Sequence, residues 1–113
     1  MTNDANNAQA TLAAELGQLR KRYLEHLRVE LGEIATSAAS ITVGQIDRQA
    51  IEAVRHRLHK LAGSAGTFGL ATIGERARML EEMAGAWLDG PVDGPDRASL
   101  SAFIEGVNAL AAL

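Results

Sequence analysis

The chain has 113 residues, a formal net charge of −3 and no cysteine. This length fits one domain with a single core and excludes a catalytic domain with a separate regulatory domain, while the lack of cysteine excludes disulfides and thiolate metal sites and favours a reducing, cytoplasmic environment. Hydrophobic residues make up 47% of the chain and aromatic residues only 4%, a balance typical of packed helices that predicts an all-α fold.

The first predicted element is a long amphipathic helix over residues 9–38. We expect residues 1–8 to form a flexible polar tail, although a short extra helical turn there is compatible with the sequence. The tail lacks the basic and then apolar layout of a signal peptide, and no apolar run in the chain approaches the roughly 18 residues of a membrane span. The apolar residues of the helix recur at steps of three and four, and they are Leu12, Leu16, Leu19, Tyr23, Leu27, Leu31 and Ile34.

Three further helices follow the first. Residues 42–44 interrupt the first pattern, and Asp47 offers a side-chain oxygen to cap a second helix that carries Ile51, Val54, Leu58, Leu61 and Ala65. The third helix carries Leu70, Ile73, Ala77, Leu80, Ala84 and Trp87 and stops at residues 89–91. After the loop at residues 91–95, Pro95 fits the first turn of a fourth helix that carries Leu100, Phe103, Ile104, Val107 and Leu110.

These four helices with short connections predict an up-down antiparallel four-helix bundle over residues 9–113. We interpret all the apolar stripes as core packing. A complete set of four helices is compatible with a monomer.

The segment over residues 55–70, RHRLHKLAGSAGTFGL, departs from what a helix prefers. Gly63, Gly66 and Gly69 recur at steps of three, and each glycine inside a helix costs about 0.5–1 kcal/mol relative to alanine. They therefore indicate either a loop or a surface that is kept bare. At about 100° per residue, His59 points roughly 140° away from the mean apolar direction of its helix and should face water.

The neighbours of His59 in angle form a surface that is charged on one side and flat on the other. Such a surface suits the docking of another protein. The residues near His59 by this criterion are Glu52, Arg55, His56, Ala62, Gly63 and Gly66.

Residues 59–70 (HKLAGSAGTFGL), followed by Leu80 and Glu81, resemble the signature of histidine-containing phosphotransfer (HPt) domains. The signature is a histidine, an aliphatic residue two positions on, glycine four on, a small residue six on, and an aliphatic helix ending near Leu-Glu. The resemblance covers the second and third helices closely, whereas the first and last helices agree only in length and periodicity.

The resemblance implies that His59 is the phosphoacceptor, that Gly63 leaves room for the phosphoaspartate of a receiver domain, and that Leu61, Ala65 and Leu80 are core residues. It also implies a multistep two-component phosphorelay in which the receiver, and not this chain, supplies a carboxylate pocket with Mg²⁺. A neutral imidazole, with an ordinary pKa near 6.5, keeps a lone pair and can attack an acyl phosphate. We expect no cofactor, nucleotide or kinase activity in this chain.

The chain departs from the family pattern at Ala62, where HPt domains usually carry a lysine. The charge that steadies the phosphoryl oxygens must then come from another residue, and Arg55, His56 and Lys60 are the candidates by position. We rank Arg55 first, because residue i−4 lies at about 40° from His59 on the helix whereas Lys60 lies at about 100°.

Other interpretations of these residues are weaker. His56 and His59 lie one helical turn apart, but Glu52 is the only acidic neighbour on that face, so we expect no metal site. The glycine-rich stretch lacks the Gly-Lys-Ser/Thr end of a phosphate-binding loop. Residues 20–60 carry eight basic and five acidic residues, against three and seven over residues 61–113. This mild basic excess suits an acidic protein partner and not a nucleic acid.

Two other functions remain open. A helical adaptor would bind receivers or partner helices without being phosphorylated, and it would have no need of His59 in this pattern. The dimerisation helices of a sensor kinase also present a histidine, but there it is normally followed by an acidic or polar residue and then Arg-Thr-Pro. Residues 60–63, Lys-Leu-Ala-Gly, depart from that sequence.

Overall fold

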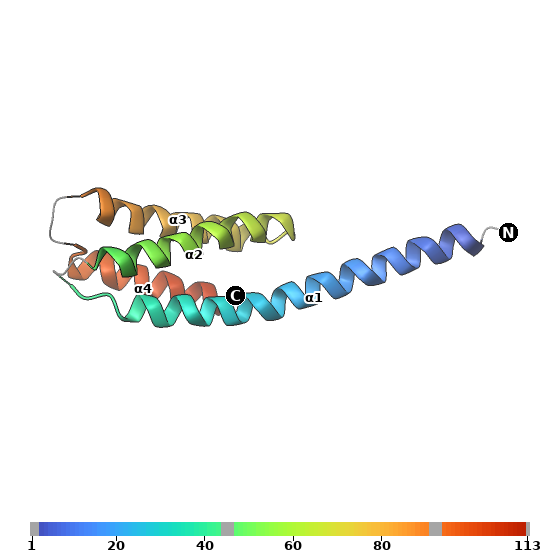
Figure 1. Ribbon diagram of the computed structural model, residues 1–113, viewed down its shortest axis with the longest axis horizontal. Helices are drawn as coiled ribbons and strands as arrows, with labels where there is room; N and C mark the ends of the chain where they lie inside the picture. Colours follow the sequence, from blue (N-terminus) through green and yellow to red (C-terminus); the bar gives the residue numbers. More distant parts are fainter. Residues whose placement is uncertain (1–2, 44–46, 91–93, 113) are drawn as a thin grey trace.

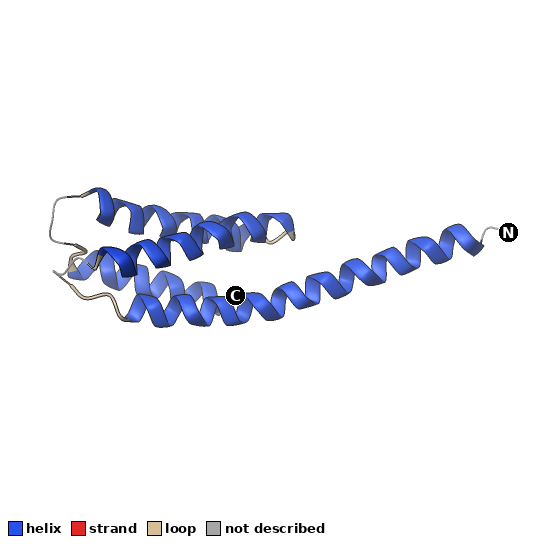
Figure 2. Cartoon of the chain, viewed as in Figure 1, coloured by secondary structure: helices blue, strands red, loops and turns tan. Residues whose placement is uncertain are grey.

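The computed structural model describes residues 3–43, 47–90 and 94–112. It contains four helices, α1 (Asn3–Ala39), α2 (Arg48–Thr67), α3 (Ala71–Asp89) and α4 (Arg97–Ala111). The helices alternate in direction (Figure 1), and no strand occurs in the residues that the structure describes (Figure 2). The prediction of an all-α, up-down antiparallel bundle is therefore confirmed. No helix in these ranges is both long and apolar enough to cross a lipid bilayer.

Two helix starts differ from the sequence prediction. The first helix begins at Asn3 and not at residue 9, so the segment expected to be a flexible tail is helical from residue 3 onward, while residues 1–2 lie outside the described part. At α4, Pro95 does not occupy the first turn. It lies before the cap and is fully buried, whereas Asp96 caps the helix by accepting a hydrogen bond from the backbone N–H of Ser99 at 2.7 Å.

The other predicted boundaries agree with the structure where it describes them. Asp47 caps α2, since its carboxylate accepts a hydrogen bond from the backbone N–H of Ala50 at 3.1 Å. The third helix ends at Asp89, as the following glycine and proline predicted. The predicted interruption at residues 42–44 and the loop at residues 91–95 lie partly outside the described residues, which omit residues 44–46 and 91–93.

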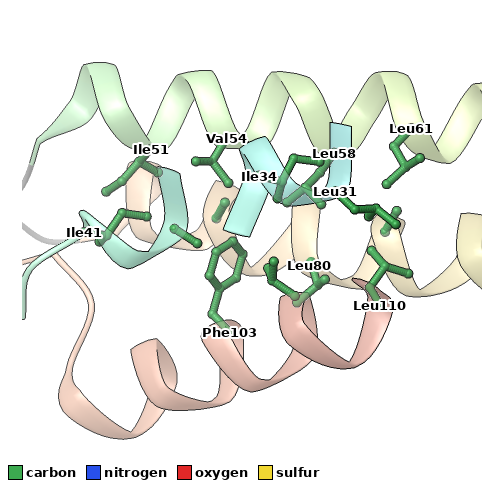
Figure 3. Close-up of a cluster of buried hydrophobic side chains, with 14 of the residues drawn as sticks. Leu31, Ile34, Ile41, Ile51, Val54, Leu58, Leu61, Leu80, Phe103 and Leu110 are labelled. Atoms are coloured by element: carbon green, nitrogen blue, oxygen red, sulfur yellow. The ribbon is translucent and has the colours of Figure 1, made fainter. Parts of the chain in front are cut away.

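The core lies between the four helices, and each contributes buried aliphatic side chains to it (Figure 3). The central residues are Ile34 of α1, Ile51, Val54 and Leu58 of α2, Leu80 of α3, and Phe103, Val107 and Leu110 of α4. Phe103 also packs edge-on against Trp87, with ring centroids 4.9 Å apart. No polar or charged side chain is buried among the described residues, so packed apolar side chains hold the bundle together.

The N-terminal part of α1 leaves the bundle and extends beyond it (Figure 1). Leu12, Leu16 and Leu19, which were predicted to lie in the core, are 57%, 57% and 50% exposed. The prediction fails for these three residues because no other helix reaches them. The bundle begins at Tyr23, whose ring stacks on Phe68 at a centroid distance of 4.2 Å.

The connection between α2 and α3 shows which of the three glycines lie in a helix and which lies in a loop. Gly63 and Gly66 lie inside α2, whereas Gly69 has a φ of +74° and follows the end of the helix. The N–H of Leu70 donates to the carbonyl of Ala65, and the N–H of Gly69 donates to the carbonyl of Gly66. This is a Schellman motif, whose left-handed residue is usually glycine.

Two contacts set the position of α3 relative to α2. Arg48, at the start of α2, donates two hydrogen bonds to the carbonyl of Leu88 near the end of α3, at 3.1 and 2.9 Å. Gly74 lies at the other end of the pair, where a Cβ atom would be 3.2 Å from the backbone oxygen of Ala62. The close approach at Gly74 and the hydrogen bonds of Arg48 align α3 with α2 along their lengths.

Candidate functional site

His59 lies on the outer side of α2, with 71% of its side chain exposed. The prediction that this imidazole faces water is therefore confirmed. Its Nδ1 atom is 2.8 Å from Oε1 of Glu81, which α3 presents from the neighbouring helix and which is only 19% exposed. One ring nitrogen is thus held by the bundle, and the ring as a whole remains open to solvent.

The contact with Glu81 defines the tautomer of the ring. An ionised carboxylate can only accept hydrogen bonds, so Nδ1 must carry the proton and donate it to Oε1. Nε2 of the neutral ring then holds the lone pair, and it has no hydrogen-bond partner among the described residues. This arrangement presents a nucleophilic nitrogen to the solvent in a fixed orientation.

An open groove of about 530 Å³ lies beside His59, between α2 and α3. Its floor on the C-terminal side of the histidine is bare, since a Cβ atom placed at Gly63 would meet no atom within 4 Å, and the same is true at Gly66 one turn further on. The residues that line the groove are Arg55, His59, Ala62, Gly63, Arg78, Glu81, Glu82, Gly85 and Asp89. The surface next to the imidazole can therefore receive a bulky partner.

Five of the six residues predicted to surround His59 line hollows beside it in two groups, whereas Gly66 lines neither hollow. Arg55, Ala62 and Gly63 line the groove, although Ala62 is only 8% exposed and offers little surface of its own. Glu52 and His56 line a shallower hollow on the N-terminal side of the histidine, which Arg55 and Glu81 share.

Lys60 lies at a different hollow of the surface. It borders a hollow between α1 and α2 together with Tyr23 and His26, and it does not line the groove beside His59. Of the three basic residues considered from the sequence, Arg55 is the one that lines the groove.

Arg57, another basic residue of α2, forms ion pairs within the bundle. Its guanidinium lies 2.6 Å from Glu33 and 3.2 Å from Glu30, both on α1. The hydrogen bond with Glu33 and the charge of Glu30 raise the pKa of Arg57 above its ordinary value. These contacts tie α1 to α2 and leave Arg57 unavailable to a ligand at the groove.

Sequence reasoning assigned no role to two residues of α3 that line the groove, Glu81 and Arg78. Glu81 was noted as part of the family signature, but its contact with His59 depends on how α3 lies against α2. The steps of three and four that place residues along one helix carry no information about this alignment. No group of three potential metal-binding side chains occurs in the described parts of the chain.

Comparison with known proteins bears on the same residues. The family model described as Hpt domain matches residues 18–112, which cover α2, α3 and α4 completely and most of α1. A search of curated proteins and a search of solved structures gave no significant match. The fold and site define a helical bundle that presents a solvent-exposed histidine beside an open groove. The chain belongs to the Hpt domain family, and so has a phosphotransfer-related role in two-component signalling, a system in which Hpt domains interact with receiver domains.

Proposed function

We propose that this chain is a phosphocarrier of a multistep phosphorelay, which accepts a phosphoryl group on Nε2 of His59 from a receiver-domain aspartate and passes it to another receiver. The observation that carries the proposal is the hydrogen bond of 2.8 Å between Nδ1 of His59 and Glu81, on a ring that is 71% exposed. It leaves Nε2 as the free nucleophile. The bare surface at Gly63 and Gly66 gives a receiver room to approach.

The transfer needs no proton to move. The lone pair of Nε2 attacks phosphorus, the N–P bond forms as the P–O bond to the aspartate breaks, and the electron pair of that bond leaves with the carboxylate. Because Nδ1 keeps its proton, the phosphorylated ring carries one positive charge, which the Glu81 carboxylate balances. The same cationic ring is a good leaving group when phosphorus passes to the next receiver.

The receiver provides the rest of the chemistry in this proposal. Its acidic pocket holds Mg²⁺, which neutralises phosphoryl charge, and its aspartate is the donor or acceptor. The chain itself supplies the nucleophile, the positive charge beside it and a surface of matching shape.

Transfer of radiolabel from a phosphorylated receiver, with Mg²⁺ present, tests the proposal. We expect the chain to acquire a label that survives alkali and is lost in acid, as an N–P bond requires, and we expect His59→Gln to abolish labelling. His26→Gln, on α1 beside a different hollow, is the matched control and should retain labelling within about twofold, since surface substitutions away from a site have small effects.

Circular dichroism should show the same helical content for all three proteins, because both histidines are exposed. Labelling of the His59→Gln variant at the parental level would refute the phosphocarrier function. If the parent binds phosphorylated receivers without acquiring label from any of them, the chain is instead an adaptor.

A further inference from the structure

Two arginines flank the imidazole in the groove, one from each helix. Arg55 of α2 lies on one side of His59, and its Nε atom is 3.6 Å from the position that a Cβ atom would take at Gly85 of α3. Arg78 of α3 lines the same groove on the other side, together with Ala62 and Gly63 of α2. In each case a long cationic side chain on one helix faces a small residue on the other.

The alignment of the antiparallel helices accounts for this pattern. Arg55 lies over Gly85, a hydrogen bond joins His59 to Glu81, and Gly74 approaches the backbone of Ala62 and Gly66. The next pair of facing positions lies one helical turn from His59 and Glu81. It is reached by three residues forward on α2, at Ala62, and three residues back on α3, at Arg78. Arg78 therefore lies across the helix pair from Ala62, where α2 itself carries no charge.

Neither arginine forms an ion pair with another described residue. The ion pairs in the described residues join Arg57 to Glu30 and Glu33, and His59 to Glu81. Glu82 and Asp89 also line the groove, but no carboxylate in these ranges lies within 4.0 Å of the guanidinium of Arg55 or Arg78. Both side chains are exposed and keep all their N–H donors for a ligand.

We infer that Arg78 is a phosphoryl-binding residue, which together with Arg55 holds the phosphoryl oxygens on His59 from the side of α3. This inference rests on the proposed function and adds a residue that sequence reasoning did not select. A dianion on Nε2 requires more positive charge than the ring supplies, and a planar guanidinium donates two N–H groups to phosphoryl oxygens. Arg78 reaches the groove from the helix opposite Ala62, so the small residue on α2 leaves that space open.

Titration of the phosphorylated chain by ³¹P NMR tests the inference without any receiver. Phosphoramidate is the phosphodonor, because its ammonia leaves as phosphorus bonds to the imidazole. We expect Arg78→Ala to raise the pKa of the phosphoryl group on His59 by about half a unit, since a nearby positive charge favours the dianion. Arg76→Ala is the matched control, because Arg76 lies on the same helix but lines a different hollow with Met79 and Met83, and it should leave this pKa unchanged.

A second experiment measures the rate of phosphoryl transfer from a phosphorylated receiver. We expect Arg78→Ala to slow transfer about tenfold, as loss of one charge-assisted hydrogen bond predicts, and Arg76→Ala to slow it less than twofold. Combining Arg78→Ala with Ala62→Lys should restore most of the rate, since a lysine stem at residue 62 can extend out of the helix contact and carry its charge to the groove.

The two experiments distinguish failure of the role of Arg78 from failure of the phosphocarrier function. If Arg78→Ala and Arg76→Ala give the same phosphoryl pKa while receivers still label the parent, Arg78 does not bind the phosphoryl group and the phosphocarrier function stands. If receivers fail to label the parent but the phosphoryl pKa still depends on Arg78, the phosphocarrier function fails and the assignment of Arg78 holds.

Discussion

His59 and Glu81 act as one unit although they lie on different helices. The carboxylate holds Nδ1 as a donor, which orients the ring and leaves Nε2 free. Because Glu81 is only 19% exposed, its interaction with a positive charge on the ring is less screened by water than that of a surface pair. In the proposed function, the pair would therefore both position the nucleophile and stabilise the phosphorylated state.

Substitution of Glu81 should separate these two roles. Glu81→Gln keeps an oxygen that accepts the Nδ1 hydrogen bond but removes the negative charge, and we expect transfer to slow about tenfold. Glu81→Ala removes both the oxygen and the charge, and we expect a loss of about a hundredfold, the upper end of the range for removal of a residue that orients a metal-ligating histidine. Stopped-flow or quenched transfer from one phosphorylated receiver measures both rates.

Glu82→Gln is the control, since Glu82 lines the same groove but forms no hydrogen bond with His59. It should transfer within about threefold of the parent. Equal rates for the parent and for Glu81→Ala would show that the Glu81 contact has no part in transfer.

At the scale of the helices, the glycines near the site serve opposite purposes. Gly63 faces open space on the outside of α2, where its lack of a side chain contributes nothing to packing. Gly74 of α3 faces the backbone of α2, where a Cβ atom would lie 3.2 Å from the oxygen of Ala62. The first glycine leaves a surface bare, where the proposed receiver would dock, and the second lets two helices approach.

Substitutions at these glycines should therefore change different properties. Gly63→Gln should slow transfer from a receiver about tenfold by obstructing its approach, while the free energy of unfolding stays the same or rises by about 0.5 kcal/mol, because glutamine is the better helix former. Gly74→Ala should lower the free energy of unfolding by about 1–3 kcal/mol through overpacking against the α2 backbone. Urea denaturation and the transfer assay together measure these effects.

The opposite effects on stability would contradict the separate roles of Gly63 and Gly74. A large loss of stability in Gly63→Gln would mean that the outside of α2 is covered, and an unchanged stability in Gly74→Ala would mean that α2 and α3 can separate without cost.

At the scale of the whole molecule, the chain consists of a packed bundle and a projecting helix. The structure measures 70 × 21 × 20 Å, and its length comes from α1, which continues past the other three helices (Figure 1). Among the described residues, Tyr23 is the first hydrophobic residue of α1 that packs against the core, where it stacks on Phe68 and shares a hydrogen bond of 2.8 Å with Ser64. Residues 7–22 of α1, which precede Tyr23, are all exposed.

Removal of residues 1–19 should therefore leave the bundle intact. We expect the midpoint of thermal unfolding to change by less than about 3 °C, because residues 7–19 are all exposed and an isolated helix of this length is marginal in water. Tyr23→Ala should instead lower the free energy of unfolding by about 1–3 kcal/mol, since it removes an aromatic stack and a hydrogen bond.

Differential scanning calorimetry measures both changes, and circular dichroism should show that the truncated chain loses helical signal in proportion to the residues removed. A fall in midpoint as large as that of Tyr23→Ala would show that the projecting helix packs against something in solution.

Apart from the starts of α1 and α4, the periodicity of the sequence was sufficient for what depends on a single helix. Apolar steps of three and four located the helices and most of the core, and the angle of His59 to the stripe of α2 correctly predicted that the imidazole is exposed. These properties are local, because the direction of a side chain on a helix follows from its position in that helix alone.

Only the tertiary structure decided what lies opposite each helix. The apolar stripe of α1 continues unchanged through Leu12, Leu16 and Leu19, yet these residues are exposed because the neighbouring helices end before them. The contact of Glu81 with His59, and the place of Arg78 across from Ala62, likewise depend on the alignment of α3 with α2. That alignment is set by contacts between residues far apart in sequence, such as the approach at Gly74, and no repeat along one helix encodes it.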